Sequence, residues 1–118
     1  VCIYVLPWHV GQMERLAFTC CEGIRALVFK NQLEVINDRA FSGCKNLEHI
    51  VFPNNLREIS DFAFARCINL KGINLPASLQ KIGYRAFGNC ESLLFVKYNS
   101  NPKVDSSAFM NCPISQEK

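Results

Sequence analysis

The chain has 118 residues, of which 49% are hydrophobic, and a formal net charge of +3. This length corresponds to one domain with enough apolar side chains for a core, and no stretch approaches the about 20 consecutive apolar residues that a membrane-spanning helix needs. The lysines and arginines are scattered among carboxylates and do not form the basic stripe typical of nucleic-acid binding, so we expect no nucleic-acid partner.

An internal repeat of 23 residues organises the chain. The chain opens in the second half of a unit, since Val5 to Pro7 match Val51 to Pro53. Full units then begin at Val10, Leu33, Leu56 and Leu79, and the last copy is one residue short. A period in the twenties is typical of a solenoid. We predict four full repeats with a partial repeat at each end, and we expect residues 1–118 to form a single domain that is a fragment of a longer array.

Each repeat carries apolar residues in fixed columns. An Ala-Phe pair recurs five times, and a cysteine follows each of these phenylalanines three residues later. The two columns hold Phe18, Phe41, Phe64, Phe87 and Phe109, and Cys21, Cys44, Cys67, Cys90 and Cys112. One unit of this size cannot bury its apolar side alone, whereas stacked units place like residues over like, about 4.8 Å apart. The columns therefore predict a continuous core.

The second half of each repeat predicts a strand. Leu47 to Phe52 space their apolar residues as LxxLxL, the strand signature of leucine-rich repeats. The alternation places Ile50 and Phe52 inward and His49 and Val51 outward. The rest of the unit is too short for a long helix, so we expect AFxxC to form one helical or 3₁₀ turn. The predicted fold class is an α/β leucine-rich-repeat solenoid, with a parallel strand sheet on the concave side and short helical or 3₁₀ turns on the other.

The full unit, LxxIxxxAFxxCxxLxxIxLP, resembles the BspA-like leucine-rich-repeat family, whose units read LxxIgxxAFxxCxxLxxIxIP. The match runs through essentially the whole chain. Lys30 and Asn99 stand where proline is usual, and the asparagine ladder of longer leucine-rich repeats is missing, so a different turn chemistry must satisfy the backbone. The resemblance implies a surface or secreted protein of bacteria or protists, with adhesion to host or matrix proteins as its usual role.

The seven cysteines predict neither a metal site nor a cofactor. No CxxC pair exists, and the only close pair, Cys20 and Cys21, is too short for usual zinc spacing. Five of the cysteines occupy the inward column, where a thiol packs as a compact hydrophobe, and parallel side chains in a column do not converge as a disulfide requires. Cys2 and Cys20 lie off the column, and either could be an exposed thiol.

Catalysis finds little support in the sequence. The two histidines are His9 and His49, and Cys44 lies five residues before His49. Cys44 belongs to the core column while His49 faces outward, and a nucleophile needs its base within hydrogen-bond reach. No glycine-rich phosphate loop or GxSxG motif occurs. We therefore expect no enzyme activity.

The outward face of the strand sheet is the predicted binding surface. Its side chains are not needed for the core, yet several are apolar, and exposed apolar residues beside charges often mark a contact surface. Two other interpretations remain: valine suits any strand, and Phe95 would be covered if a capping unit followed. The candidate residues are Arg25, Val28, His49, Val51, Lys71, Asn74, Leu94, Phe95 and Lys97.

The sequence thus favours a non-catalytic protein-interaction or adhesion module of a cell-surface or secreted protein. Its partner would be a host, matrix or other surface protein. The alternative is a structural spacer that presents another domain and has no ligand of its own. A column of thiols fits a reducing compartment, whereas the family resemblance points outside the cell. The two are compatible because buried thiols are protected from oxidants.

Overall fold

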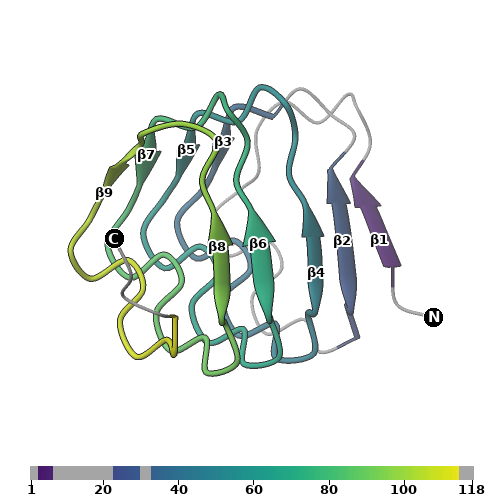
Figure 1. The fold of residues 1–118 in the computed structure, drawn as a ribbon. Helices are drawn as coiled ribbons and strands as arrows, with labels where there is room; N and C mark the ends of the chain where they lie inside the picture. Colours follow the sequence, from purple (N-terminus) through teal and green to yellow (C-terminus); the bar gives the residue numbers. More distant parts are fainter. Residues whose placement is uncertain (1–2, 7–22, 30–32, 115–118) are drawn as a thin grey trace.

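A computed structural model describes residues 3–6, 23–29 and 33–114. In this part of the chain the backbone winds as a parallel-strand solenoid, in which each coil adds one strand to each of two sheets (Figure 1). The predicted solenoid of parallel strands is therefore confirmed. Within the described ranges no helix is long and apolar enough to cross a membrane. The predicted column members Phe18 and Cys21, and Lys30, lie outside the described residues.

The first sheet contains the predicted LxxLxL strands. β1 (Ile3–Leu6), β2 (Ala26–Phe29) and β4 (His49–Val51) pair in parallel, and β6 (Gly72–Asn74) pairs with β8 (Phe95–Lys97). β6 lies beside β4, so the strands form one row although the backbone ladder is interrupted between these two (Figure 1). Partner residues in this row, such as Ala26 and His49, are one repeat apart in the sequence. The strands therefore pair in a register in which each residue lies beside the equivalent residue of the next repeat.

A second parallel sheet forms from the first half of each repeat. It contains the two-residue strands β3 (Val35–Ile36), β5 (Glu58–Ile59), β7 (Lys81–Ile82) and β9 (Lys103–Val104), in that order. Its inward column contains Ile36, Ile59 and Ile82, each at most 1% exposed. The repeat predicted a continuous apolar core, but not that this half of each unit would form strands.

The AFxxC segments form turns, and the predicted helical or 3₁₀ turn is absent from those that the structure describes. Successive backbone amides in these segments donate alternately to their own coil and to the next coil. The amides of Ala40 and Ser42 donate to carbonyls three residues back in the same coil, at 3.1 and 3.3 Å. The amides of Arg39, Phe41 and Gly43 donate instead to the next coil, at 3.0, 2.8 and 2.8 Å. A helix requires consecutive amides to bond within their own segment, and here every second amide joins two coils.

The residue before three of the described AFxxC segments, and the fourth residue of all four, adopt the left-handed backbone conformation. The first position holds Arg39, Phe62 and Arg85, with φ from 50° to 59°. The second holds Gly43, Arg66, Asn89 and Asn111, with φ from 60° to 80°. For residues other than glycine this conformation costs roughly 1–2 kcal/mol. We attribute its recurrence to the hydrogen bonds between coils, which the alternating peptide directions make possible.

The phenylalanine column lies at the centre of the core. Phe41, Phe64 and Phe87 are fully buried. Successive rings from Phe41 to Phe109 lie 5.3 Å apart between centroids, with interplanar angles of 6° to 8°. The ring of Phe52 meets the edge of this stack, 5.9 Å from Phe64 at 90°. Such stacked and edge contacts add to the stabilisation that burial alone gives.

Cys44, Cys67 and Cys90 of the cysteine column are buried as predicted, whereas Cys112 is half-buried. Thiols of this column also form hydrogen bonds. Cys67 and Cys90 are fully buried. The Sγ of Cys67 donates to the Phe41 carbonyl at 3.4 Å, and the Sγ of Cys90 donates to the Phe64 carbonyl at 3.2 Å. Cys112 repeats the contact with the Phe87 carbonyl at 3.0 Å. Each of these thiols therefore links its coil to the preceding one.

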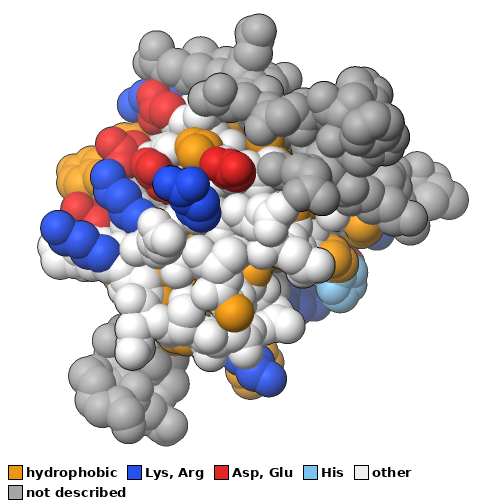
Figure 2. Space-filling view, turned by 90° about the horizontal axis from the view of Figure 1, so that it is seen from above, with side chains coloured by type: hydrophobic (Ala, Val, Ile, Leu, Met, Phe, Trp, Pro, Cys, Tyr) orange, Lys and Arg blue, Asp and Glu red, His pale blue; other side chains and the backbone are white. Residues whose placement is uncertain are grey.

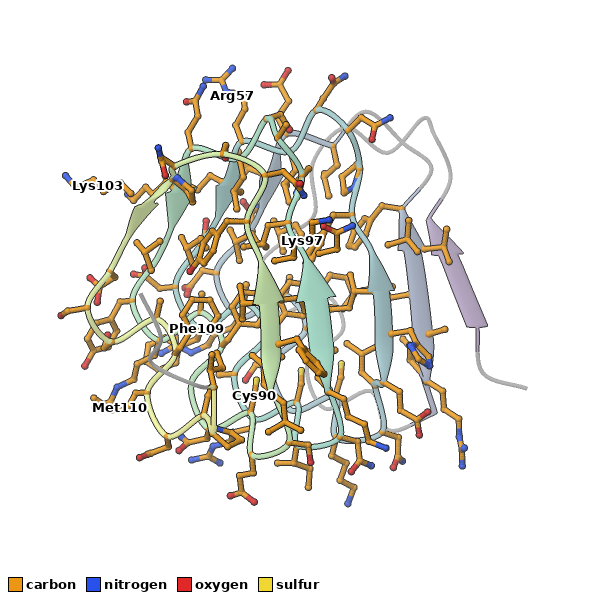
Figure 3. The ribbon with its side chains drawn as sticks, viewed as in Figure 1. Arg57, Cys90, Lys97, Lys103, Phe109 and Met110 are labelled. Atoms are coloured by element: carbon orange, nitrogen blue, oxygen red, sulfur yellow. The ribbon has the colours of Figure 1, made fainter. Side chains whose placement is uncertain are left out.

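The last coil leaves the ends of several apolar columns half-buried. Val96, Val104 and Phe109 pack against the core on one side, whereas Phe87 one coil earlier is fully buried. Figure 3 shows Phe109 in the interior between the two sheets, at the end of the array. These residues are half-exposed because no described coil covers them.

We expect Phe64→Ala to lower the free energy of unfolding by roughly 3–5 kcal/mol, because it removes a fully buried ring from the middle of the stack. Urea unfolding followed by circular dichroism measures the change. The matched control is Phe95→Ala, since Phe95 is 69% exposed and should change stability by no more than about 0.5 kcal/mol. Equal effects of the two substitutions would contradict the buried column.

Candidate functional site: the outward face of the strand row

The predicted binding residues lie on the outward face of the row formed by β2, β4, β6 and β8. Strand pairing arranges this face in two columns. The first contains Ala26, His49, Gly72 and Phe95, and the second contains Val28, Val51, Asn74 and Lys97. Arg25, Lys71 and Leu94 come directly before their strands. The structure thus brings the six candidates on the strands to one face of the row and places the other three at the ends of those strands.

Three apolar side chains on this face are more than half exposed. Phe95 is 69% exposed, Val51 55% and Leu94 53%. Val28 is half-buried, and the polar candidates Arg25, His49, Lys71, Asn74 and Lys97 are exposed. Inward neighbours on the same strands, such as Leu27 and Ile73, are buried. The alternation predicted for these strands is therefore present.

The apolar candidate residues form two separate pairs. Val28 and Val51 are register neighbours on β2 and β4. Leu94 and Phe95 lie two strands away, at the start of β8 (Figure 1). Between the pairs runs β6, whose outward residues are Gly72 and Asn74. The face is therefore not one continuous apolar patch.

Gly72 allows the Phe95 side chain to lie close to the sheet. A methyl group added at Gly72 would lie 3.4 Å from Cβ and 3.5 Å from Cδ2 of Phe95. These are ordinary contact distances, so the Phe95 side chain lies beside the position that a side chain at residue 72 would take. Phe95 itself is 69% exposed and accessible to a partner.

Asn99, in the turn after β8, holds the outward side chain of Asn74 by a hydrogen bond. The Nδ2 of Asn99 donates to the Oδ1 of Asn74 at 2.8 Å and to the Leu75 carbonyl at 2.6 Å. Asn99 stands where other repeats have proline, and its amide ties the last coil to the preceding one. This supplies part of the different turn chemistry that the sequence required.

Tyr98 is an exception to the burial of the inward positions. It occupies the inward position at which Phe29, Phe52 and Leu75 are buried, but it is 44% exposed. Partial burial raises the pKa of Tyr98. The reason is its place in the last described coil, which leaves one side of the ring uncovered. The spacing alone could not show this, because it is the same in every coil.

The edge above the sheets carries charges of both signs. Figure 2 shows lysine and arginine side chains interspersed with aspartate and glutamate there. Arg57 lies 3.4 Å from Glu34, and Lys81 lies 3.9 Å from Glu58. Figure 3 shows Arg57 and Lys103 extending outward at this edge. Exposed pairs of this kind contribute little stability, and their mixed signs form no basic stripe.

The cysteines and histidine that the structure describes do not form a nucleophile–base pair. Cys44 is buried while His49 is exposed on the opposite side of the strand row. Cys112 lowers the pKa of Cys90, but the Cys67 thiol and burial outweigh this effect and raise it. The Cys90 thiol and burial raise the pKa of Cys112. A raised pKa keeps a thiol protonated, which is its less nucleophilic form.

Metal ligation has no candidate cluster within the described ranges. No group of three or more histidine, cysteine, aspartate or glutamate residues lies close enough there to hold a metal ion. His9, Cys2 and Cys20 lie outside the described residues.

The sequence profile described as "BspA type Leucine rich repeat region" matches residues 5–117, in six copies. A comparison with curated proteins finds no match.

Solved structures show the same fold. A leucine-rich-repeat protein from T. pallidum is 28% identical with a TM-score of 0.85, and the match covers 96% of this chain and 56% of that one. A leucine-rich cell-surface protein from Faecalibacterium prausnitzii A2-165 is 26% identical with a TM-score of 0.80, covering 98% and 32%. A leucine-rich-repeat protein from Eubacterium ventriosum has a TM-score of 0.91 at 23% identity, covering 100% and 32%, and shows the fold alone. The chain spans about half or less of the length of these proteins.

We expect the free energy of unfolding to fall as the pH rises above about 8.5, the ordinary pKa of a cysteine in an unfolded chain. The folded state holds the protons of Cys90 and Cys112 more tightly than the unfolded state does. The stability that this contributes is fully present below the unfolded pKa and is lost as the pH rises toward the folded pKa. Urea unfolding at a series of pH values measures the dependence.

The control for this measurement is Cys90→Ala. Tyr98 also has a pKa raised by burial and titrates at alkaline pH, so the slope of the wild-type protein alone does not identify the thiols. The variant should show a shallower loss of stability. An unchanged slope would contradict the assignment to the cysteine column.

Proposed function

We propose that this chain, which belongs to the BspA-type leucine-rich-repeat family, is a non-catalytic module that binds another protein through the outward face of β2, β4, β6 and β8. A solenoid offers an extended surface whose exposed residues can vary without disturbing the core. In this chain the phenylalanine and cysteine columns form the core. The outward columns are therefore available for recognition.

The observation that carries the proposal is the exposure of Phe95. It is 69% exposed, although it lies in a strand whose inward neighbour Val96 packs against the core. Aromatic residues are enriched among the side chains that contribute most to protein interfaces. Leu94, 53% exposed, extends the apolar surface beside it, and Val51 with Val28 forms a second anchor two strands away.

The polar residues of the same face suggest the chemistry of the partner. Arg25, Lys71 and Lys97 are exposed and positively charged at neutral pH, and His49 lies among them. Complementary charge steers association and fixes the register of two surfaces. We infer that the partner presents carboxylates around an apolar contact.

Family and structural relatives support a location outside the cytoplasm. One solved relative is described as a leucine-rich cell-surface protein. We propose that this chain acts in a surface or secreted protein, with adhesion to a host, matrix or other surface protein as its role. We also propose that residues 1–118 are one domain of a longer array, which the half-buried Val96, Val104 and Phe109 would continue.

A structural spacer is the second candidate. It is favoured by the separation of the two apolar pairs, since Gly72 and Asn74 leave no apolar side chain on β6 between them. A spacer would need the stacked core but no particular outward residues. The two functions therefore differ in what substitutions on the face should do.

We expect the double substitution Val51→Ser and Phe95→Ser to weaken binding to immobilised extracellular-matrix proteins at least tenfold, because it removes one exposed anchor from each apolar pair (about 1.4 kcal/mol or more). The melting temperature should stay unchanged, since both side chains are exposed. Surface plasmon resonance against a panel of such proteins measures the affinity.

The matched control is Met110→Ser. Met110 is 39% exposed and lies on the turn side, away from β8 (Figure 3). It should leave binding unchanged. If the wild-type protein and the double variant bind equally, or if the wild-type protein binds nothing in the panel, the spacer function is favoured.

A further inference from the structure

Three arginines surround a hollow on the turn side of the solenoid. The hollow has a volume of about 360 Å³ and is lined by Arg39, Arg66 and Arg85 from three successive coils. Cavities of roughly 300 Å³ and above accommodate small ligands. This surface is formed by the AFxxC turns and is distinct from the outward face of the strand row.

A column of small residues forms the floor of the hollow. Successive coils place Ser42, Ala65 and Gly88 at the same position. The next residue of the column is Met110, so the run of small side chains ends there. A methyl group added at Gly88 would lie 3.1 Å from the Cβ of Arg85, which is tighter than ordinary contact. The side chains that line the hollow at this position of the repeat are therefore small in three successive coils.

Aromatic rings hold two of the guanidinium groups in place. The guanidinium carbon of Arg39 lies 4.6 Å from the centroid of the Phe62 ring, and that of Arg85 lies 5.2 Å from the Tyr84 ring. The two rings themselves meet edge to face at 5.5 Å. Stacking on a ring leaves the N–H groups at the edge of the Arg85 guanidinium available to an anion, whereas the Arg39 guanidinium also donates to the Asp38 carboxylate.

The charge of the hollow is positive on balance. No aspartate or glutamate lies among the described residues that line it. Asp38 forms an ion pair with Arg39 at 3.3 Å and offsets one of the three positive charges. Asp61 lies on the neighbouring surface, where its carboxylate accepts a hydrogen bond from the Tyr84 amide at 2.9 Å.

One donor in this group is unsatisfied. The Nε of Arg85 is buried and has no hydrogen-bond partner within the described part of the chain. Leaving a buried donor without a partner costs roughly 1–3 kcal/mol, and more for a charged group. A ligand oxygen that accepts from this N–H would remove the cost once the Arg85 side chain moves to expose its buried Nε.

We propose that the hollow binds a tetrahedral oxyanion, a sulfate or phosphate group carried by a small molecule. Guanidinium groups on different coils can each donate to a different oxygen of such a group, and charge-assisted bonds from arginine are strong and directional. The floor of small side chains leaves room for the group to approach the backbone. This site would act independently of the protein-binding face proposed above.

The test is an NMR titration of the ¹⁵N-labelled full chain with inorganic sulfate and, separately, inorganic phosphate, with sodium chloride keeping the ionic strength constant. We expect saturable shifts of the Arg85 Nε–H signal and of the amides of Ser42, Arg66 and Asn89. The anion that saturates at the lower concentration identifies whether the natural group is a sulfate or a phosphate.

The variant for this test is Arg66→Asn combined with Arg85→Gln. Asparagine suits the backbone at position 66, since Asn89 and Asn111 occupy the same position with φ of 60° and 62°. The double variant should bind at least tenfold more weakly. Arg57→Gln removes one charge from the opposite edge, where Arg57 pairs with Glu34, and should leave binding unchanged. The proposal is overturned if neither anion saturates the shifts, or if Arg57→Gln weakens binding as much as the double variant does.

Discussion

Backbone hydrogen bonds between successive coils are the interaction on which the rest of this structure depends. They run along the strand row, along the second sheet and, less expectedly, through the AFxxC turns, where the amides of Phe41, Phe64 and Phe87 each donate to the next coil. Because these bonds hold the coils in register, equal positions of the repeat lie over one another. The stack of phenylalanine rings and the thiol-to-carbonyl bonds of the cysteines follow from that register.

The sequence predicted which side chains are buried and which are exposed, because this depends on the period of the apolar residues. The burial of Phe64 and Cys67, and the exposure of His49 and Val51, follow from a repeat whose apolar residues return at fixed spacing. The turn side was predicted less well. A helical turn and the observed chain of turns bury the same phenylalanine, so the apolar pattern does not distinguish them. The helical turn and the observed turns differ in the acceptors of alternate backbone amides, and those acceptors are carbonyls of the adjacent coil.

Two other features could not be predicted from the repeat pattern, because they also depend on neighbouring coils. Tyr98 has the spacing of a core residue, yet it is 44% exposed because its burial requires a further coil. The arginine hollow arises from side chains of three repeats at once, and no single repeat contains its pattern. The outward face, by contrast, could be located from one repeat, since strand alternation alone places its residues. Whether that face binds a protein is a question of affinity and not of geometry.

The central claim is that the turns join coils instead of forming helices, and NMR couplings across hydrogen bonds test it most directly. The structure predicts a coupling between the amide nitrogen of Phe64 and the carbonyl carbon of Ala86, whose oxygen lies 2.7 Å from that nitrogen. A helical turn would instead couple Phe64 to Ser60 or Asp61. Detection of the coupling to Ala86 would support the account, and a coupling to Ser60 or Asp61 in its place would contradict it.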